Sequence, residues 1–431
     1  MKYKTIRFLA PALSAALALS LLAGCGAAGN TAGSASAGSS VSSVTETASA
    51  SSAASTAAQS LSADVDVSGA TAITLSGTSA AVSGSGASAE GGVVTITDGG
   101  TYVVTGTLTE GRIIVDAKGE DVTIVLNGAS ITCSYGSPIY IYKSSSTTIH
   151  LAEGSENDLT DGSSYTFADS YSSAEDEEPN ACLYSKSDLI IQGTGSLTVT
   201  ANYNNGITSK DTLTITDATI TVNAVNHGIN GKDSAAISNA TITVMAKGDA
   251  IRSTNESDDS LGWITFSGGT YVLTSGDDAI HAITLVQIDG GDFTITAAEG
   301  IEATYVRIND GTIYIEASDD GINAARKSDA YTPTVEINGG EITIVMGAGD
   351  TDGIDSNGNI VVNGGTISVT GNSTFDYDGT ATYNGGTIIV NGQQVDSIPN
   401  QFMGGMGGMG GWGGQQGGQQ QGGWGGPGGR R

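Results

Sequence analysis

The amino-acid sequence predicts an all-β protein whose main domain is a right-handed, three-strand parallel β-helix, a solenoid fold. Two repeated features lead to this prediction: a short motif that returns every 21 to 22 residues, and a glycine turn followed by an alternating strand. A repeat of this length fits one coil of such a solenoid, whereas a propeller blade needs about 40 to 50 residues. Helical periodicity does not compete with these signals in the body of the chain.

The first motif is a small residue followed by isoleucine. The isoleucines are Ile207, Ile229, Ile251, Ile280, Ile301, Ile322 and Ile354. They are 22, 22, 29, 21, 21 and 32 residues apart, so two of the steps contain loop insertions. If each isoleucine has the same place in its coil, its neighbours lie about 4.8 Å away along the axis.

The second motif is a turn of Asn-Gly-Gly or Asp-Gly-Gly followed by a strand. It occurs at residues 289–296, 338–344, 363–369 and 384–390. Glycine supplies the positive φ that a tight turn requires. In the strands, polar residues alternate with apolar ones, which predicts Ile and Val inside the coil and Thr outside.

The first part of the chain has the features of an export signal. Residues 1–24 have a basic start and an apolar run from Phe8 to Leu22, which is short for a membrane span of about 20 residues. The run ends in Leu22-Ala23-Gly24-Cys25, which resembles the lipobox of bacterial lipoproteins. We therefore expect a lipid on Cys25 to anchor the protein to the membrane at the extracellular cell surface. An ordinary signal peptide that contains a cysteine is the alternative.

Three further segments follow the signal peptide. Residues 25–62 are rich in Ser, Ala and Thr, and we expect a disordered tether because such a segment cannot bury a core. Residues 63–396 carry the repeats and are predicted to form the β-helix domain. Residues 397–431 are rich in Gly and Gln, which predicts a disordered tail.

The excess of acidic residues restricts the kinds of molecule that the protein can bind. The chain has 45 acidic and 16 basic residues and a formal net charge of −29, which excludes nucleic acid as a natural partner. A polyanionic substrate would need bridging cations. Cys133 and Cys182 are expected to be buried thiols, although the sequence leaves their pairing open.

Acidic residues recur at fixed distances from the repeated isoleucine. Two places before it are Asn205, His227, Asp249, Asp278, Glu299, Asp320 and Asp352, and one place after it are Thr208, Asn230, Arg252, His281, Glu302, Asn323 and Asp355. Stacked carboxylates repel one another by about 1 kcal/mol even in water. No Lys or Arg occurs between Lys327 and Arg430, so metal ions are the expected neutralisers.

Carboxylate oxygens on adjacent coils suit Ca²⁺, which accepts six to eight oxygen ligands. The predicted ligands are Asp277, Asp278, Asp319, Asp320, Asp350, Asp352, Asp355, Glu299 and Glu302. The alternative is that these acids form a solvated face that keeps the protein soluble.

The chain resembles the family of bacterial surface carbohydrate-binding domain-containing proteins, which are polysaccharide-lyase-like right-handed β-helices. The resemblance covers about residues 90–395 and is carried by segments 95–106, 122–128 and 183–191 together with the Asp-Gly-Ile series. It implies binding of cellulose or of pectin-like acidic glycans, with calcium held on the side of the β-helix.

The resemblance also raises the question of catalysis. The segment Asp319-Asp320-Gly321-Ile322-Asn323 resembles the acidic motif of calcium-dependent pectate lyases, although Asn323 replaces an acid. β-Elimination needs a base near the calcium, and the only candidates close to the motif are Arg326, Lys327 and Arg307. We therefore expect non-catalytic glycan binding, with an active lyase and a structural surface adhesin as the alternatives.

Side chains for glycan contact complete the prediction. Trp263 is expected to lie in an insertion, residues 254–260 with their flanks, that projects beside the acidic coils. Arg326 and Lys327 are expected to contact a glycan carboxylate. Other aromatic residues that the pattern allows on the outside are Tyr271, Tyr305, Tyr314 and Tyr331.

Overall fold

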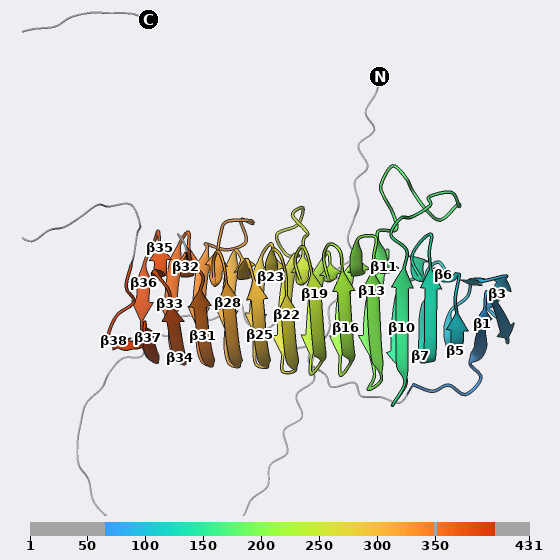
Figure 1. Cartoon of the computed structure of the whole chain (residues 1–431), viewed down its shortest axis with the longest axis horizontal. Coiled ribbons are helices and arrows are strands. Elements are labelled where there is room, and N and C mark those ends of the chain that lie inside the picture. The colour runs from blue at the N-terminus through green and yellow to red at the C-terminus, as the bar shows by residue number, and fades with distance from the viewer. Residues whose placement is uncertain (1–64, 349–350, 401–431) are drawn as a thin grey trace, which may run out of the picture. The chain divides into compact units, whose positions relative to one another are not determined.

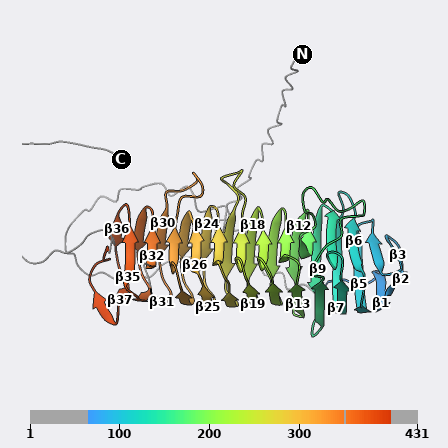
Figure 2. The same cartoon turned by 45° about the horizontal axis from the view of Figure 1, so that its top comes forward.

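The computed structural model describes residues 65–348 and 351–400, and these residues fold into a parallel β-helix. Its coils stack along one axis, and each complete coil contributes one strand to each of three faces (Figures 1 and 2). Within this part of the chain, no helix is long and apolar enough to span a membrane. The predicted fold class is confirmed.

The strands of each face pair in parallel with their neighbours one coil away. The first face consists of β9 (Ser146–Leu151), β12 (Asp188–Gln192), β15 (Thr212–Thr216), β18 (Ser234–Ser238), β21 (Trp263–Ser267), β24 (Leu285–Ile288), β27 (Tyr305–Ile308), β30 (Thr334–Ile337), β33 (Asn359–Val362) and β36 (Ala381–Tyr383). The second face consists of β10 (Glu156–Asp161), β13 (Ser196–Ala201), β16 (Thr219–Ala224), β19 (Thr241–Ala246), β22 (Thr270–Thr274), β25 (Asp292–Ala297), β28 (Thr312–Ala317), β31 (Glu341–Met346), β34 (Thr366–Thr370) and β37 (Thr387–Val390). The third face consists of β4 (Val93–Ile96), β6 (Arg112–Asp116), β8 (Ile139–Lys143), β11 (Ala181–Ser185), β14 (Asn205–Ser209), β17 (Ile229–Gly231), β20 (Ile251–Ser253), β23 (Asp278–Ala282), β26 (Glu299–Ala303), β29 (Ile322–Ala324), β32 (Asp352–Ser356) and β35 (Ser373–Tyr377).

Antiparallel strands lie at both ends of the stack. At the N-terminal end, β2 (Ser79–Ser83) pairs with β1 (Thr71–Gly77), and β3 (Ala87–Glu90) pairs with β4. The long strands β5 (Gly100–Leu108) and β7 (Asp121–Cys133) run through the first and second faces of the earliest coils. At the C-terminal end, β38 (Gln393–Val395) turns back on β37.

The repeated isoleucines form a continuous ladder inside the third face. Ile207, Ile229, Ile251, Ile280, Ile301, Ile322 and Ile354 are partners from coil to coil, and Phe375 extends the ladder. All of them are fully buried. Each buried side chain of this size contributes about 1.5 to 3 kcal/mol, so the ladder supplies a large part of the core. The predicted register of the third face is confirmed.

The small residue before each isoleucine lies at the corner where the second face meets the third. A Cβ atom on Gly206 would lie 2.3 Å from Cγ1 of Val222, and one on Gly228 would lie 2.4 Å from Cγ1 of Val244. The chain bends inward at this point, so two consecutive residues face the core. Lack of space in the core therefore explains why a small residue precedes each isoleucine of the motif.

The glycine turns join the first face to the second. Gly340, Gly365 and Gly386 have φ values of 88°, 84° and 93°, as the Asn-Gly-Gly motif predicts. The asparagines before the glycines stack in a ladder in which each side-chain amide donates to the residue one coil earlier. The donor pairs are Asn338 to Asn309 at 2.8 Å, Asn363 to Asn338 at 2.7 Å and Asn384 to Asn363 at 2.7 Å.

Cys133, Cys182 and Tyr271 all lie in the core of the coils. Cys133 and Cys182 are buried free thiols, which confirms their place in the core. The expectation that Tyr271 lies outside is wrong. Tyr271 pairs with Ile242 on one neighbouring coil and with Phe293 on the other, as a core residue does. Its ring stacks on the Phe293 ring with the centroids 4.4 Å apart, and its hydroxyl donates a hydrogen bond to the carbonyl of Gly268.

Candidate functional site: an acidic strip on the third face

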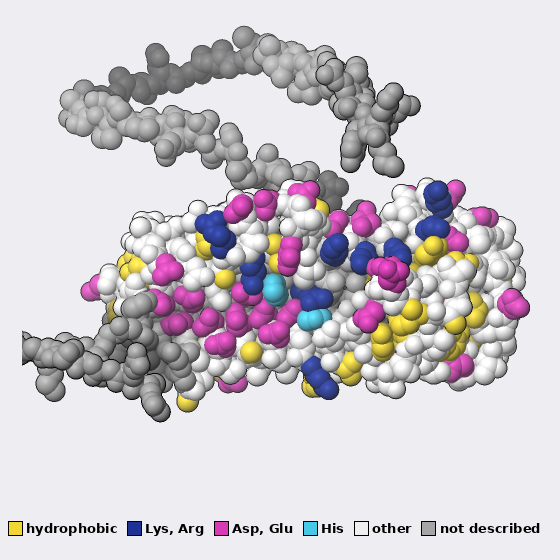
Figure 3. Space-filling view, turned by 90° about the horizontal axis from the view of Figure 1, so that it is seen from above, with side chains coloured by type: hydrophobic (Ala, Val, Ile, Leu, Met, Phe, Trp, Pro, Cys, Tyr) yellow, Lys and Arg dark blue, Asp and Glu magenta, His cyan; other side chains and the backbone are white. Residues whose placement is uncertain are grey.

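Acidic side chains gather in a band on the third face. Figure 3 shows the molecule from the side on which Figure 1 labels β11, β23, β32 and β35, with Asp and Glu grouped toward the C-terminal coils. Histidine and basic side chains lie at the end of this band nearer the N-terminus. We call the band the acidic strip; its residues are Asp249, Asp278, Glu299, Glu302, Asp320, Asp352, Asp355 and Asp376.

Two parallel columns of side chains make up the strip. In the corner column, Asp278 pairs with Glu299, and backbone amides of the adjoining small residues bond to the carbonyls of Asp249, Asp278, Asp320 and Asp352 on the following coils. In the strand column, the partners from coil to coil are Thr208, Asn230, Arg252, His281, Glu302, Asn323, Asp355 and Asp376. Both predicted columns therefore exist.

Asp278, Glu299 and Glu302 form a carboxylate cluster that can hold a metal ion. One oxygen from each lies within 4.8 Å of the others, and the residues come from the adjacent strands β23 and β26. Burial, with the charge of Glu302 adding to it, raises the pKa of Asp278 to about 6. Burial and the charges of Glu302 and Asp278 raise the pKa of Glu299 to about 8. These shifts indicate repulsion that a bound cation would relieve.

A second metal-capable group overlaps the first and includes nitrogen. It consists of Asp249, Asp278 and His281, again with ligand atoms within 4.8 Å. Nδ1 of His281 lies 2.7 Å from Oδ2 of Asp278 and 3.8 Å from Oε2 of Glu302. Burial acts to lower the pKa of His281, but the carboxylates of Asp278, Asp249 and Glu302 raise it. An imidazolium here supplies positive charge from within the protein.

At the N-terminal end of the strip, Arg252 and the His227 ring lie beside Asp249. Nη1 of Arg252 lies 3.5 Å from Oδ2 of Asp249, and Nδ1 of His227 lies 3.2 Å from the same oxygen. Burial acts to raise the pKa of Asp249, but His227, His281 and Arg252 lower it. Asp249 is therefore an ionised carboxylate balanced by its neighbours, unlike Glu299.

At the C-terminal end of the strip, the carboxyl groups of Asp320 and Asp355 have raised pKa values. Burial and the charges of Asp320, Asp352 and Asp376 raise the pKa of Asp355 to about 7. Burial and the charges of Asp319 and Asp352 raise the pKa of Asp320 to about 6. Among the described residues, no ion pair involves Asp320 or Asp355. This end of the strip depends on protons or on external cations for neutralisation.

The predicted metal ligands do not all lie in the strip. Asp278, Glu299 and Glu302 meet in one cluster, and Asp320, Asp352 and Asp355 lie on the coils that follow. Asp277 and Asp319 are exposed residues at the corner before the third face. Asp350 lies outside the described residues, as do Cys25, the predicted signal peptide and tether, and most of the predicted tail.

The three predicted glycan contacts lie in different surroundings. Nζ of Lys327 lies 2.8 Å from Oε1 of Glu302, at the edge of the carboxylate cluster. Arg326 is exposed and pairs with Asp329 at 3.1 Å. The expected place of Trp263 is wrong, because it opens strand β21 on the first face rather than projecting beside the acidic coils. Its role in glycan contact stays a prediction.

Two loops border the strip at the corner between the third and first faces. They are residues 254–262, before β21, and residues 325–333, before β30. The loops contact each other, because Ser328 Oγ donates to Oδ1 of Asp259 at 2.5 Å. The second loop carries both Arg326 and Lys327, so the contact helps to fix the position of Lys327 beside Glu302.

A second charged cluster lies on the third face nearer the N-terminus. Glu178 is buried and accepts from Nζ of Lys186 at 2.6 Å and from Nζ of Lys210 at 2.7 Å. Burial acts to raise the pKa of Glu178, but the two lysines lower it to about 2. The lysines are therefore engaged in a structural ion-pair network and are not free for an anionic ligand.

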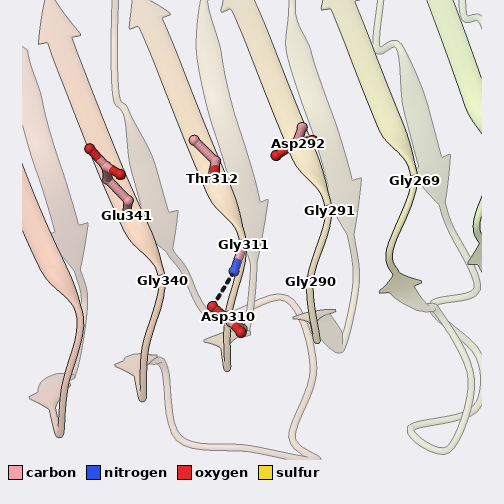
Figure 4. Close-up of a pocket in the computed structure, with 9 residues that line it drawn as sticks. All are labelled: Gly269, Gly290, Gly291, Asp292, Asp310, Gly311, Thr312, Gly340 and Glu341. Carbon is pink, nitrogen blue, oxygen red and sulfur yellow. Dashed lines mark hydrogen bonds between the residues drawn. The ribbon is translucent and has the colours of Figure 1, made fainter.

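A shallow trough of about 580 Å³ runs along the glycine turns (Figure 4). It is lined by Gly269, Gly290, Gly291, Gly311, Gly340, Asp292, Asp310, Thr312 and Glu341. A Cβ on Gly311 would lie 2.8 Å from the carbonyl oxygen of Gly291, and one on Gly340 would lie 2.7 Å from that of Gly311. The close approach of neighbouring coils explains the glycines, so the trough follows from coil stacking.

The chain is similar to carbohydrate-binding domain-containing proteins. Residues 90–305 and 297–397 match the family of carbohydrate-binding domain-containing proteins. A carbohydrate-binding domain-containing protein from Acetivibrio thermocellus is 45% identical over 132 residues, which is 30% of this chain and 45% of that protein. The match thus spans less than half of the relative's length.

The fold also has a solved counterpart. The structure of a polysaccharide lyase-like protein from C. thermocellum, described as a gadolinium derivative, matches with 35% sequence identity and a TM-score of 0.52. The match covers 57% of this chain and 96% of that one. Because the family match extends over most of the chain and includes every coil of the acidic strip, this protein belongs to the carbohydrate-binding domain-containing family.

Proposed function

We propose that the protein binds an extended, acidic polysaccharide through calcium on the third face. The observation that carries this proposal is the cluster of Asp278, Glu299 and Glu302, whose oxygens lie within 4.8 Å of one another. Three carboxylates from adjacent coils suit Ca²⁺, which prefers hard oxygen ligands. A calcium ion held there would keep open coordination positions for a carboxylate of the glycan.

The electrostatics of the strip support a cation at this cluster. The raised pKa values of Glu299 and Asp278 mean that the cluster is costly to ionise without a counterion. The overlapping group of Asp249, Asp278 and His281 suits calcium less well, because one of its three ligands is an imidazole nitrogen and calcium prefers oxygen. We therefore place the first calcium at Asp278, Glu299 and Glu302.

Family membership supports a carbohydrate as the partner, and the charge of the chain supports an acidic one. A protein with net charge −29 repels polyanions unless a cation bridges the two. In this proposal calcium is that bridge, and the straight third face allows successive sugars to lie along the coils. The anchor on Cys25 would hold the domain at the cell surface.

Retention on insoluble glycans tests the proposal. The purified chain carrying Cys25→Ser would be mixed with polygalacturonate or cellulose particles, in calcium or in excess chelator. We expect calcium-dependent retention on polygalacturonate. The double variant Glu299→Gln/Glu302→Gln should lose it, whereas Asp292→Asn/Glu341→Gln, which removes two exposed charges at the glycine trough, should keep it. Retention that is equal in calcium and chelator would overturn the calcium part of the proposal.

A polysaccharide lyase is the second candidate, because Lys327 lies beside the carboxylate cluster. With Nζ 2.8 Å from Glu302, this lysine has the place that a general base requires near a metal. The same retention experiment separates the two candidates. Rising ultraviolet absorbance of unsaturated uronates, lost in Lys327→Met, would identify a lyase; retention without new absorbance supports a binding protein. Retention on neither glycan would favour the adhesin alternative.

The lipid anchor can be tested separately. Growth of the source cells with a labelled fatty acid should label the wild-type chain and not Cys25→Ser. Label in both chains would show that Cys25 is not the attachment site.

A further inference from the structure

Buried polar atoms without hydrogen-bond partners gather in the strand column. Among the described residues they include Oγ1 of Thr208, Oδ1 of Asn230, Nε of Arg252, Nε2 of His281 and Oδ1 of Asn323. Thr208 is 2% exposed and Asn230 is 6% exposed. Leaving such an atom unpaired lowers the stability of the fold. The strand column around Arg252 is therefore incompletely hydrogen-bonded within the protein.

Arg252 is the cationic member of the column. Its side chain is 22% exposed, and its closest carboxylate contact is the 3.5 Å distance from Nη1 to Oδ2 of Asp249. Burial lowers the pKa of this guanidinium, and Asp249 only partly offsets the effect. A guanidinium has five N–H donors in a planar fork, which matches a carboxylate through two parallel hydrogen bonds. Arg252 does not have such a partner among the described residues.

The neighbouring imidazole leaves the same guanidinium incompletely satisfied. The backbone N–H of Asp249 points at Nδ1 of His227 at 2.9 Å, and Nη1 of Arg252 lies 2.8 Å from Nε2 of the same ring. A neutral imidazole can accept at only one nitrogen. Either the Asp249 amide or the Arg252 guanidinium therefore lacks a hydrogen-bond acceptor. An anion that accepts hydrogen bonds from the guanidinium would leave the imidazole nitrogen free to accept from the amide.

We propose that Arg252 anchors a carboxylate of the glycan and so selects chains that contain uronic acids. The inference rests on the proposed function, because it assumes that a glycan lies along the third face. Hydroxyl groups of the same chain would make weaker contacts with exposed polar side chains of the third face. Arg252 is a binding residue for substrate choice in this assignment and not a metal ligand.

The register places Arg252 at a useful distance from the calcium cluster. Its next partners along the column are His281 and then Glu302, so Arg252 and Glu302 are separated by two coil steps, about 10 Å. One sugar acid on Arg252 and another on calcium would hold the glycan at two points. A chain with neutral sugars would have only the weaker hydroxyl contacts.

The test compares binding of an oligogalacturonate and of its methyl ester to the purified chain in saturating calcium. Arg252→Gln should lower affinity for the acidic oligomer by about 10- to 100-fold, the effect of losing a charge-assisted hydrogen-bond pair. Affinity for the methyl ester should not change. Arg252→Lys keeps the charge without the planar fork, so its affinity should be intermediate. Lys118→Gln is the control, because Lys118 is exposed in the turn between β6 and β7, many coils from Arg252, and it should bind like wild type.

Terbium luminescence without glycan tests metal binding separately from the role of Arg252 in glycan binding. Arg252→Gln should bind terbium like wild type, which shows that the metal cluster is intact. If wild type binds the acidic oligomer and Arg252→Gln binds it equally well, the role of Arg252 is overturned and the proposed function stands. An equal loss for acid and methyl ester would also overturn it, because the residue would then be structural. If wild type does not bind the oligomer in calcium, both proposals fail. Arg252→Lys provides the same comparison if the Gln variant does not fold.

Discussion

Lys327 and Glu302 form an ion pair with an Nζ–Oε1 distance of 2.8 Å, and this lysine is the last basic residue before the C-terminal coils. The pair divides the acidic strip into two parts. On the N-terminal side, Arg252 and two histidines lie among the carboxylates. On the C-terminal side, Asp320 and Asp355 have no ion-pair partner among the described residues, and Asp352 and Asp355 come after Lys327 in a stretch of sequence without Lys or Arg. The protein therefore supplies its own counterions at one end of the strip only.

The first prediction concerns this ion pair. Lys327→Met should lower the stability of the metal-free protein by about 1 to 3 kcal/mol, because Glu302 loses its cationic partner in a crowded acidic site. Calcium should restore much of that loss by replacing the missing charge. Thermal melts in chelator and in calcium measure both effects. Arg326→Met is the control, since its exposed pair with Asp329 contributes little. An equal loss in both variants would contradict the prediction.

The second prediction is that Glu299→Gln/Glu302→Gln reverses the effect of calcium. Without metal, the variant should melt at the same or a higher temperature than wild type, because the loss of repulsion among Asp278, Glu299 and Glu302 offsets the loss of the ion pair between Glu302 and Lys327. In calcium, wild type should become the more stable protein. Binding stabilises a fold by about 2.7 kcal/mol when the ligand is at 100 times its Kd. Melting curves that calcium shifts equally in both proteins would place the calcium elsewhere.

The third prediction is a pH dependence with a definite sign. The folded pKa values of about 6 for Asp278, 6 for Asp320, 7 for Asp355 and 8 for Glu299 exceed the unfolded values of about 4. The folded state therefore holds protons that the unfolded state has released, and stability falls as pH rises from about 4 to 8. The metal-free protein should melt a few degrees lower at pH 8 than at pH 5. Calcium should flatten this slope, because it replaces the protons. A metal-free melting temperature that rises over the same range would refute the raised pKa values.

The fourth prediction concerns Glu178, whose pKa is shifted in the opposite direction. Its folded pKa of about 2 is below the unfolded value of about 4.3, so its contribution is lost as pH falls through this window. Glu178→Gln should cost about 1 to 3 kcal/mol at neutral pH, because Lys186 and Lys210 lose their shared partner. Chemical unfolding at neutral pH and at pH 3 measures the difference, which should shrink at the lower pH. Glu175→Gln, an exposed acid in the same loop, should have no such effect.

The fifth prediction tests the corner between the second and third faces. Gly228→Ala would place a Cβ 2.4 Å from Cγ1 of Val244 and 2.5 Å from the carbonyl oxygen of Ala250. We expect a loss of about 1 to 3 kcal/mol from overpacking, measured by chemical unfolding. Ala250 has the same place one coil later, so Ala250→Gly is the matched comparison and should cost less. A neutral Gly228→Ala would show that the corner has room that the structure does not show.

The sequence predicts the parts of this protein that repeat. The isoleucine ladder and the two acidic columns follow from spacing alone, because a parallel β-helix puts equivalent residues on top of one another. The same spacing identified Asp278, Glu299 and Glu302 as neighbours. A periodic pattern, however, reports which residues share a column and not which atoms meet.

Individual contacts could not be predicted for physical reasons. Arg252 was visible in the strand column, but its incomplete hydrogen bonding depends on the His227 ring one coil earlier. Trp263 was misplaced because an insertion of known length does not reveal where the next strand begins. The contact between Asp259 and Ser328 joins two loops that are 69 residues apart, and no repeat constrains it. Tyr271 is buried because it packs in the core against the rings of Phe266 and Phe293, a contact that the alternating pattern does not reveal.

The antiparallel strands at the two ends fix the length of the domain. An open end of a parallel β-helix presents unpaired amides and carbonyls that another chain can extend. Here β2, β3 and β38 occupy those positions in a direction that cannot propagate a coil. A coil inserted between the ends as a whole repeat would keep these antiparallel pairings intact. Insertion of whole repeats could therefore lengthen the third face by one coil at a time without disturbing the strands at either end.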